Sequence, residues 1–109
     1  MNKPTILVLG ALLAANVQAG GDAAKGKQKA AQICAACHGA DGTKPSAPDQ
    51  PVLAGQYPDY LVQALSDYKS GRRKNPIMKG FAEPLSKQEM EDVAAWFASQ
   101  PKTPLHDQR

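Results

Sequence analysis

Bulky apolar side chains, aromatic rings, cysteines and histidines are all scarce in this chain of 109 residues. Aromatic residues make up 6% of it, with a single Trp, two Cys and two His. Beyond residue 19 only 20 apolar residues larger than alanine remain, the two cysteines included, which is few for a core in a size class where burial is already marginal. We therefore expect a group other than a side chain to fill the middle of the fold. The length also excludes several domains, a doubly wound α/β enzyme and a TIM barrel.

Other common patterns are missing as well. No alternation of apolar and polar residues indicates a strand, and the chain has no internal repeat and no long low-complexity tract. Its charge is nearly balanced, with 13 Lys and Arg against 10 Asp and Glu. Basic residues cluster at 69–74, but no interleaved aromatic side chains accompany them, so nucleic-acid binding is not indicated.

The longest apolar run lies at the N-terminus and has the layout of a secretory signal. Lys3 precedes an apolar stretch over 6–17, and Ala19 closes a segment with the small residues that a signal peptidase needs. The stretch is shorter than the roughly 20 residues that span a bilayer, which argues against the alternative of a retained membrane anchor. We predict that residues 1–19 are cleaved and that no stable membrane insertion follows. Residues 20–109 then form a single domain, with a mobile tail over 102–109.

Both cysteines belong to one motif. Cys34, Cys37 and His38 stand in the C-x-x-C-H pattern of covalent haem attachment, in which each thiol adds to a haem vinyl group and the histidine becomes an axial ligand of the iron. A thioredoxin-like redox pair lacks its βαβ context here, and a structural zinc site lacks further ligands, since the other histidine is His106 in the tail. A simple disulfide is chemically allowed in an oxidising compartment. The pattern favours one covalently attached haem c, with its iron, as the cofactor.

Capping and breaking residues predict an all-α fold of three main helices joined by long loops. Caps or early prolines open each helix, and glycines end the first two. A capping box, with Ser at the N-cap and Glu three residues later, opens the last helix. The predicted segments are a helix from Asp22 to Gly39, a loop over 40–56, a helix over 58–70 stopped by Gly71, a loop over 72–84 and a helix that starts at Ser86 with Glu89 in its capping box and ends by Gln100.

A haem held by His38 needs a sixth ligand or leaves an open site, and besides a lysine few residues can supply one. Met90 follows Leu85 at the spacing of a hydrophobic staple, so it has a structural task on the last helix. His106 lies in the polar tail. Met78 lies in a loop punctuated by Pro and Gly, where no helical face claims it and its thioether can point at the iron. We predict His38 and Met78 as the axial ligands.

Across residues 20–109 the chain resembles the small bacterial class I cytochromes c, in the branch of periplasmic electron carriers. With a single attachment motif it is expected to be a mono-haem member. The resemblance implies a compact fold in which the first and last helices cross, with Gly26 packed against Trp96, and in which the loops wrap around the covalently bound haem. The matching features are Gly26 in the first helix, the stretch from Cys34 to Gly39, the stretch from Pro51 to Gln56, Tyr60, the Gly71-Arg72-Arg73 turn, the Met78 loop and the pair Trp96-Phe97.

The resemblance also implies roles for residues around the haem. The backbone carbonyl of Pro51 is expected to accept a hydrogen bond from the His38 ring and thereby to fix its orientation. Arg73 and Arg72 are expected to face a haem propionate.

The function that the resemblance implies is periplasmic electron transfer by a carrier that is not itself an enzyme. Two strong axial ligands leave no free coordination site, and a thioether raises the reduction potential relative to a second imidazole. Redox partner proteins are expected to dock at the exposed haem edge through a small, transient interface, with Lys44, Lys74 and Lys79 as candidate contacts, and the protein is expected to be a monomer or a weak dimer.

Two alternatives stay open. In the first, the chain is the haem-bearing relay subunit of a periplasmic dehydrogenase complex. In the second, it is a five-coordinate haem protein that binds gas or acts as a peroxidase. The second alternative requires that Met78 does not ligate the iron.

Overall fold

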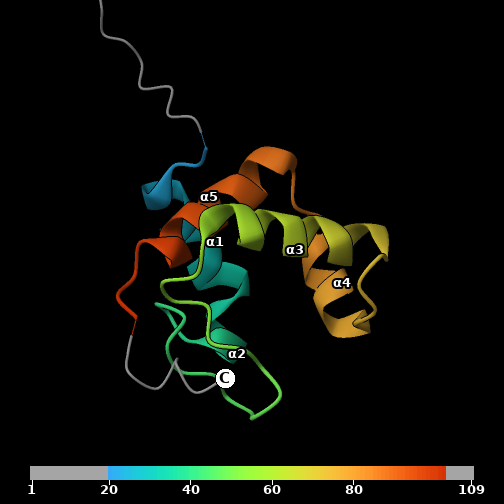
Figure 1. Ribbon diagram of the computed structural model, residues 1–109, viewed down its shortest axis with the longest axis horizontal. Helices are drawn as coiled ribbons and strands as arrows, with labels where there is room; N and C mark the ends of the chain where they lie inside the picture. The colour runs from blue at the N-terminus through green and yellow to red at the C-terminus, as the bar shows by residue number, and fades with distance from the viewer. Residues whose placement is uncertain (1–19, 103–109) are drawn as a thin grey trace, which may run out of the picture.

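The computed structural model describes residues 20–102, which form five helices and no strand. The predicted all-α fold is confirmed, and the three predicted main helices are its longest elements. In Figure 1, α3 lies in front of the crossed pair of α1 and α5, α4 lies below the far end of α3, and α2 lies at the bottom beside the long loop. The helices are α1 (Ala23–Ile33), α2 (Ala35–His38), α3 (Pro58–Ser70), α4 (Pro76–Ala82) and α5 (Lys87–Ala98).

Some predictions concern segments outside the described residues. These segments are the signal peptide, residues 1–19, and the tail from residue 103 onward, which includes His106. Within residues 20–102, no helix is both long enough and apolar enough to cross a membrane.

The first predicted helix begins and ends where its caps place it, but it is interrupted. The side chain of Asp22 accepts hydrogen bonds from the backbone amides of Ala24 and Lys25, as an N-cap does. At Cys34 the backbone departs from the helix, with a φ of −108°, and then restarts as the short α2. Gly39 ends α2 with a φ of +89°, which glycine adopts without steric cost.

The caps of α3 and α5 are those that the sequence predicts. Pro58 occupies the first turn of α3, and Gly71 stops it in the left-handed conformation. The Ser86 hydroxyl accepts from the Glu89 amide while the Glu89 carboxylate accepts from the Ser86 amide, so the capping box is complete.

The predicted loop over 72–84 contains a helix, so that prediction is wrong. Residues 76–82 form α4, and Met78 therefore lies on a helix. Pro76 stands in the first turn, where a missing amide does no harm, and the side chain of Asn75 accepts from the amides of Ile77 and Met78. The loop prediction treats Pro76 as a helix breaker, whereas a proline directly after a capping asparagine begins a helix.

The core lies where α1 crosses α5 and where α3 packs on α5. Gly26 makes the crossing close, because a Cβ there would overlap the backbone of Asp92 and Val93 in α5. The atoms nearest to a Cβ at this position are backbone, and the Trp96 indole packs against the same core; the expected packing of Gly26 against Trp96 stays a prediction. The buried cluster consists of Ala30, Leu61, Val93, Ala94 and Phe97.

Candidate functional site

His38 is a buried imidazole with one nitrogen committed and one available. The residue ends α2 and is 7% exposed. Its Nδ1 lies 2.9 Å from the carbonyl oxygen of Pro51, which is the hydrogen bond that the resemblance implies. A carbonyl only accepts, so Nδ1 carries the proton and Nε2 keeps its lone pair. Within residues 20–102, no protein group forms a hydrogen bond with Nε2, so a metal can accept that lone pair.

The two cysteines are presented by one tight turn together with His38. The carbonyl oxygen of Cys34 accepts from the amide of Cys37 at 3.2 Å and from that of His38 at 3.0 Å. Both thiols are free and partly buried. Burial raises the pKa of the Cys34 thiol to about 11, so this thiol is protonated at neutral pH. A redox-active thiol pair needs a thiolate, and this environment argues against one at Cys34.

The loop that supplies the Pro51 carbonyl is tied to the attachment motif and to α5. The Gly42 carbonyl accepts from the amides of Leu53 at 2.9 Å and Ala54 at 3.2 Å. The amide of Gly55 donates to the carbonyl of Phe97 at 2.9 Å. The loop is therefore closed on itself on either side of Pro51 and is anchored to the end of α5 directly after it, which holds the Pro51 carbonyl at the His38 ring.

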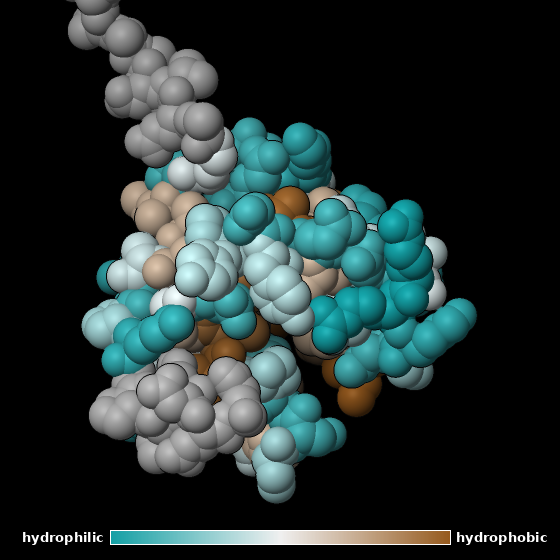
Figure 2. Space-filling view, viewed as in Figure 1, coloured by the Kyte–Doolittle hydropathy of each residue, from teal (hydrophilic) through white to brown (hydrophobic). Residues whose placement is uncertain are grey.

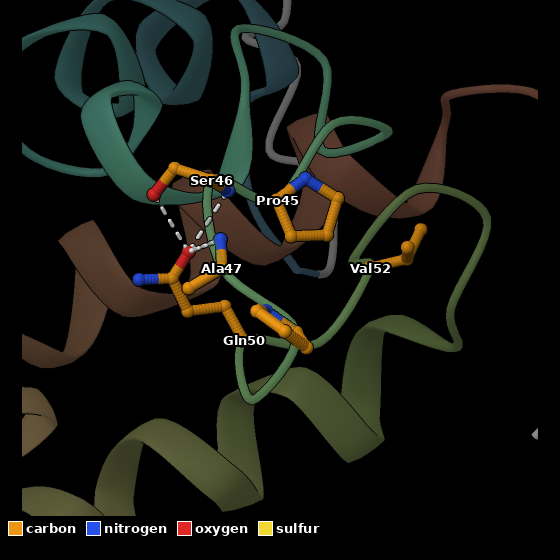
Figure 3. A pocket seen from close by; sticks show the side chains of 6 residues that line it. Pro45, Ser46, Ala47, Gln50 and Val52 are labelled. Atoms are coloured by element: carbon orange, nitrogen blue, oxygen red, sulfur yellow. Dashed lines mark hydrogen bonds between the residues drawn. The ribbon is translucent and has the colours of Figure 1, made fainter.

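Two further side chains brace this loop. Trp96 Nε1 donates to the Ala40 carbonyl at 3.0 Å, two residues after His38. Gln50 Oε1 accepts from the amide and the hydroxyl of Ser46, both at 2.9 Å, and from the amide of Ala47 at 3.0 Å. Figure 3 shows Gln50 reaching back to these two residues, beside an open depression that Pro45, Ser46, Ala47, Pro48, Gln50 and Val52 line. Neither brace has a sequence signal, because each joins residues that no periodic pattern relates.

Met78 lies on α4, half-buried, between two exposed apolar neighbours. Ile77 is 69% exposed and Phe81 is 41% exposed. In Figure 2 the visible face is hollowed between the region of α2 with its loop and that of α4, and hydrophobic side chains reach the surface beside the hollow. Apolar side chains at a hollow suit a large apolar ligand better than water.

The two arginines have partners on α3. The Arg72 guanidinium lies 3.8 Å from the Asp67 carboxylate, and that of Arg73 lies over the Tyr68 ring, 4.7 Å from its centroid. Both arginines are exposed. Their expected role toward a propionate remains a prediction.

The donor set fits haem c. Two thiols at C-x-x-C spacing, an adjacent imidazole with a free Nε2 and a thioether on a separate helix are the groups that covalent attachment and axial ligation require. A structural zinc site is not supported, since residues 20–102 contain no cluster of three or more His, Cys, Asp or Glu side chains placed to hold a metal ion.

Comparison with known proteins agrees with this chemistry. The cytochrome c family pattern matches residues 23–101. The chain is 48% identical to cytochrome c4 of Pseudomonas aeruginosa over 101 residues, which is 92% of this chain and 49% of that protein. It is 45% identical over 76 residues to a thiosulfate dehydrogenase electron acceptor of Stutzerimonas stutzeri, covering 70% of this chain and 35% of that one. It is 41% identical over 83 residues to cytochrome c-554(548) of Halomonas halodenitrificans, covering 73% of this chain and 98% of that one.

A solved structure is similar as well. Reduced recombinant cytochrome c4 from Pseudomonas stutzeri superposes with a TM-score of 0.68 at 46% identity, over 74% of this chain and 46% of that chain. The chain thus spans about half the length of the cytochrome c4 proteins that it matches. The match over residues 23–101 and these identities establish that the chain belongs to the cytochrome c family, with haem c as its cofactor.

Proposed function

We propose that this protein is a one-electron carrier in the periplasm, with His38 and Met78 as the axial ligands of its haem iron. The observation that carries the proposal is the buried His38 imidazole, in one turn with the two cysteines, whose Nδ1 is held by the Pro51 carbonyl and whose Nε2 has no hydrogen-bond partner within residues 20–102. When bound, the haem supplies the redox chemistry, a change of one electron between ferrous and ferric iron.

The residues of the protein attach the haem, orient its histidine ligand and shield the iron. Cys34 and Cys37 give their thiols to two thioether bonds, which keep the cofactor in place without reliance on affinity. The Pro51 carbonyl fixes the tautomer and the plane of the His38 ring, and such a partner makes the ligand nitrogen more basic. With the haem bound, the Met78 thioether would occupy the remaining coordination site and keep water and substrate from the iron, which would leave electron transfer as the chemistry of the site.

The proposed location rests on the predicted signal segment, and the proposed partner contacts rest on the surface near α4. The predicted signal over 1–19 supports export to the periplasm. Redox partners dock weakly near α4, where the exposed side chains of Ile77 and Phe81 adjoin Lys74 and Lys79. Such contacts stay small and transient, which fits a monomer or a weak dimer. In this proposal Arg72 and Arg73 leave their partners on α3 to contact a propionate.

A second candidate is a haem-bearing relay subunit of a periplasmic dehydrogenase. The relative of Stutzerimonas stutzeri that is named as the electron acceptor of thiosulfate dehydrogenase favours it. Affinity purification of the tagged protein from periplasmic extract distinguishes the two candidates. A stoichiometric catalytic subunit that stays bound through gel filtration supports the relay, whereas elution alone with a full haem complement supports the free carrier.

The ligand assignment is tested with two methionine variants of similar volume. Met78→Leu should abolish the near-infrared sulfur-to-iron band of the ferric protein and lower the midpoint potential, because a thioether is lost from the iron. Met90→Leu, at a buried position within α5, should keep both. An unchanged band in Met78→Leu, or carbon monoxide binding by the unaltered ferrous protein as fast as by that variant, contradicts ligation by Met78.

A further inference from the structure

The helix that carries Met78 is too short to be stable by itself. Isolated helices below about 12 residues are marginal in water, and α4 extends only from Pro76 to Ala82. Of its residues, only Ala82 is fully buried. The contacts of α4 with its neighbours therefore decide where Met78 lies.

One of these contacts joins α4 to the end of α3. Lys79 Nζ donates to the backbone carbonyl of Lys69 at 3.3 Å and also pairs with Glu83 at 3.2 Å. The Lys69 carbonyl is one of the last four of α3, which have no intrahelical partner. The Lys79 ammonium satisfies that carbonyl and ties the middle of α4 to α3.

A second contact secures the chain on the other side of α4. Lys69 Nζ donates to the backbone carbonyl of Leu85, in the turn between α4 and α5. Leu85 is buried, so its carbonyl needs a partner within the protein. The two lysines thus connect α3, α4 and the start of α5 in series (Figure 1).

We propose that Lys69 and Lys79 form a two-lysine latch that sets how readily α4, and with it Met78, moves away from the haem iron. This inference rests on the proposed ligation by Met78. Both lysines are positioning residues, since neither is placed at the iron. Each supplies a charged donor to a carbonyl that has no other partner in the described part of the chain, and hydrogen bonds from charged donors are the stronger kind in proteins. Loss of either bond raises the population of the state in which α4 is detached.

The population of the detached state can be read from the binding of imidazole to the ferric protein. An external ligand reaches the iron only when Met78 has left it, so its apparent affinity scales with the open fraction. Lys79→Met and Lys69→Met keep the apolar stem and remove the ammonium. Each should increase the apparent imidazole affinity about tenfold, because a hydrogen bond to a charged group is lost. Lys79→Arg keeps a charged donor and should stay close to the unaltered protein.

The chain offers a matched control for the ion pair. Lys87 pairs with Glu91 at 3.2 Å with the same i, i+4 spacing as Lys79 and Glu83, but it lies on α5 and makes no such carbonyl contact within residues 20–102. Lys87→Met should leave imidazole affinity unchanged. Glu83→Gln, which breaks only the ion pair of Lys79, should change it less than twofold.

The outcomes separate the latch from the ligation. If the unaltered ferric protein has no sulfur-to-iron band, the proposed ligation by Met78 fails. If it has the band and Lys79→Met binds imidazole no better than Lys87→Met, the latch is wrong although the ligation stands. Equal effects of Glu83→Gln and Lys79→Met would also overturn the latch. Should Lys69→Met not fold, Lys79→Met and Lys79→Arg decide, since the Lys79 side chain is 43% exposed and tolerates replacement.

Discussion

The crossing of α1 and α5 predicts that one added methyl group destabilises the protein strongly. In Gly26→Ala the new Cβ would overlap the carbonyl group of Asp92, well inside the 3.0 Å below which real Cβ atoms do not approach. The added Cβ would be fixed to the backbone of α1 and the atoms that it meets are backbone atoms of α5, so no side-chain rotation can relieve the overlap. The helices must separate by about 1 Å, a gap that forfeits a quarter to a half of the dispersion attraction between the atoms that face it.

The expected cost follows from two opposing terms. Overpacking of a rigid site costs about 3 kcal/mol, whereas alanine in place of glycine inside a helix gains about 1 kcal/mol. The separation also strains the hydrogen bond of 2.8 Å from the Asp22 amide to the Asp92 carboxylate, which joins the same two helices. We therefore expect Gly26→Ala to lower the free energy of unfolding by about 2 kcal/mol, or roughly 10 °C in Tm.

Gly80→Ala is the matched control, because Gly80 also lies inside a helix but has nothing within 4 Å of its Cβ position. It stands two residues after Met78 and hence about 200° around α4, on the opposite face. It should stabilise by about 0.5–1 kcal/mol. Urea unfolding of the holoproteins, followed by far-ultraviolet circular dichroism, measures both. Equal stabilities of Gly26→Ala and Gly80→Ala would refute the backbone-contact argument.

Three further predictions concern the loop, the last helix and the cofactor. Gly42→Ala places a Cβ 2.8 Å from an aromatic carbon of α5 at a φ of +82°, whereas Gly71→Ala places one in open space at a φ of +87°. Gly42→Ala should therefore lower the urea midpoint more than Gly71→Ala. Equal midpoints would exclude a tight loop contact. The capping-box bond from the Ser86 amide, and then Lys29, hold the pKa of Glu89 below its ordinary value of 4.5. Because the pKa is lower in the folded state, the ionised carboxylate stabilises the protein fully above pH 4.5, and this stabilisation is lost as the pH falls through the folded pKa. Glu89→Gln should therefore make the urea midpoint fall less steeply at acid pH. An unaltered slope would disprove this. The double variant Cys34→Ala, Cys37→Ala should lose covalent haem and, once extracted, most of its helical circular dichroism, because the side chains alone make a thin core; a native-like spectrum without haem would contradict this.

The sequence predicts the termini of helices better than it predicts contacts between them. Asp22, Pro58, Gly71 and the capping box act within a few residues, and each has the predicted effect. The prediction of a loop over 72–84 is wrong, because Pro and Gly act there within a helix that the Asn75 side chain caps. Local signals are sufficient to predict α4, because an asparagine directly followed by a proline begins a helix.

Contacts at a distance leave weaker traces in a single sequence. The contact of Gly26 with the backbone of α5 is not predicted from the sequence, because the register of two crossing helices depends on the whole interface and a glycine contact with backbone has no complementary residue type. The carbonyl contacts of Lys69 and Lys79 span 16 and 10 residues, and lysines at such spacings are usually solvated. By contrast, the motif from Cys34 to His38 predicts the haem attachment site from the sequence, since covalent attachment dictates both residue type and spacing.

The scarcity of large apolar residues has a structural counterpart. Within residues 20–102, four of the nine buried hydrophobic residues are alanines, and Phe97 is the largest fully buried side chain. The buried cluster joins α1, α3 and α5, whereas His38 is the buried residue of α2 and Ala82 that of α4. Cys34 is half-buried and packs against this same core, so a thioether bond at Cys34 joins the haem to the best-packed part of the protein. The chain thus supplies a narrow helical support, and the apolar body of the cofactor completes the interior between that support, the loop with Pro51 and the helix with Met78.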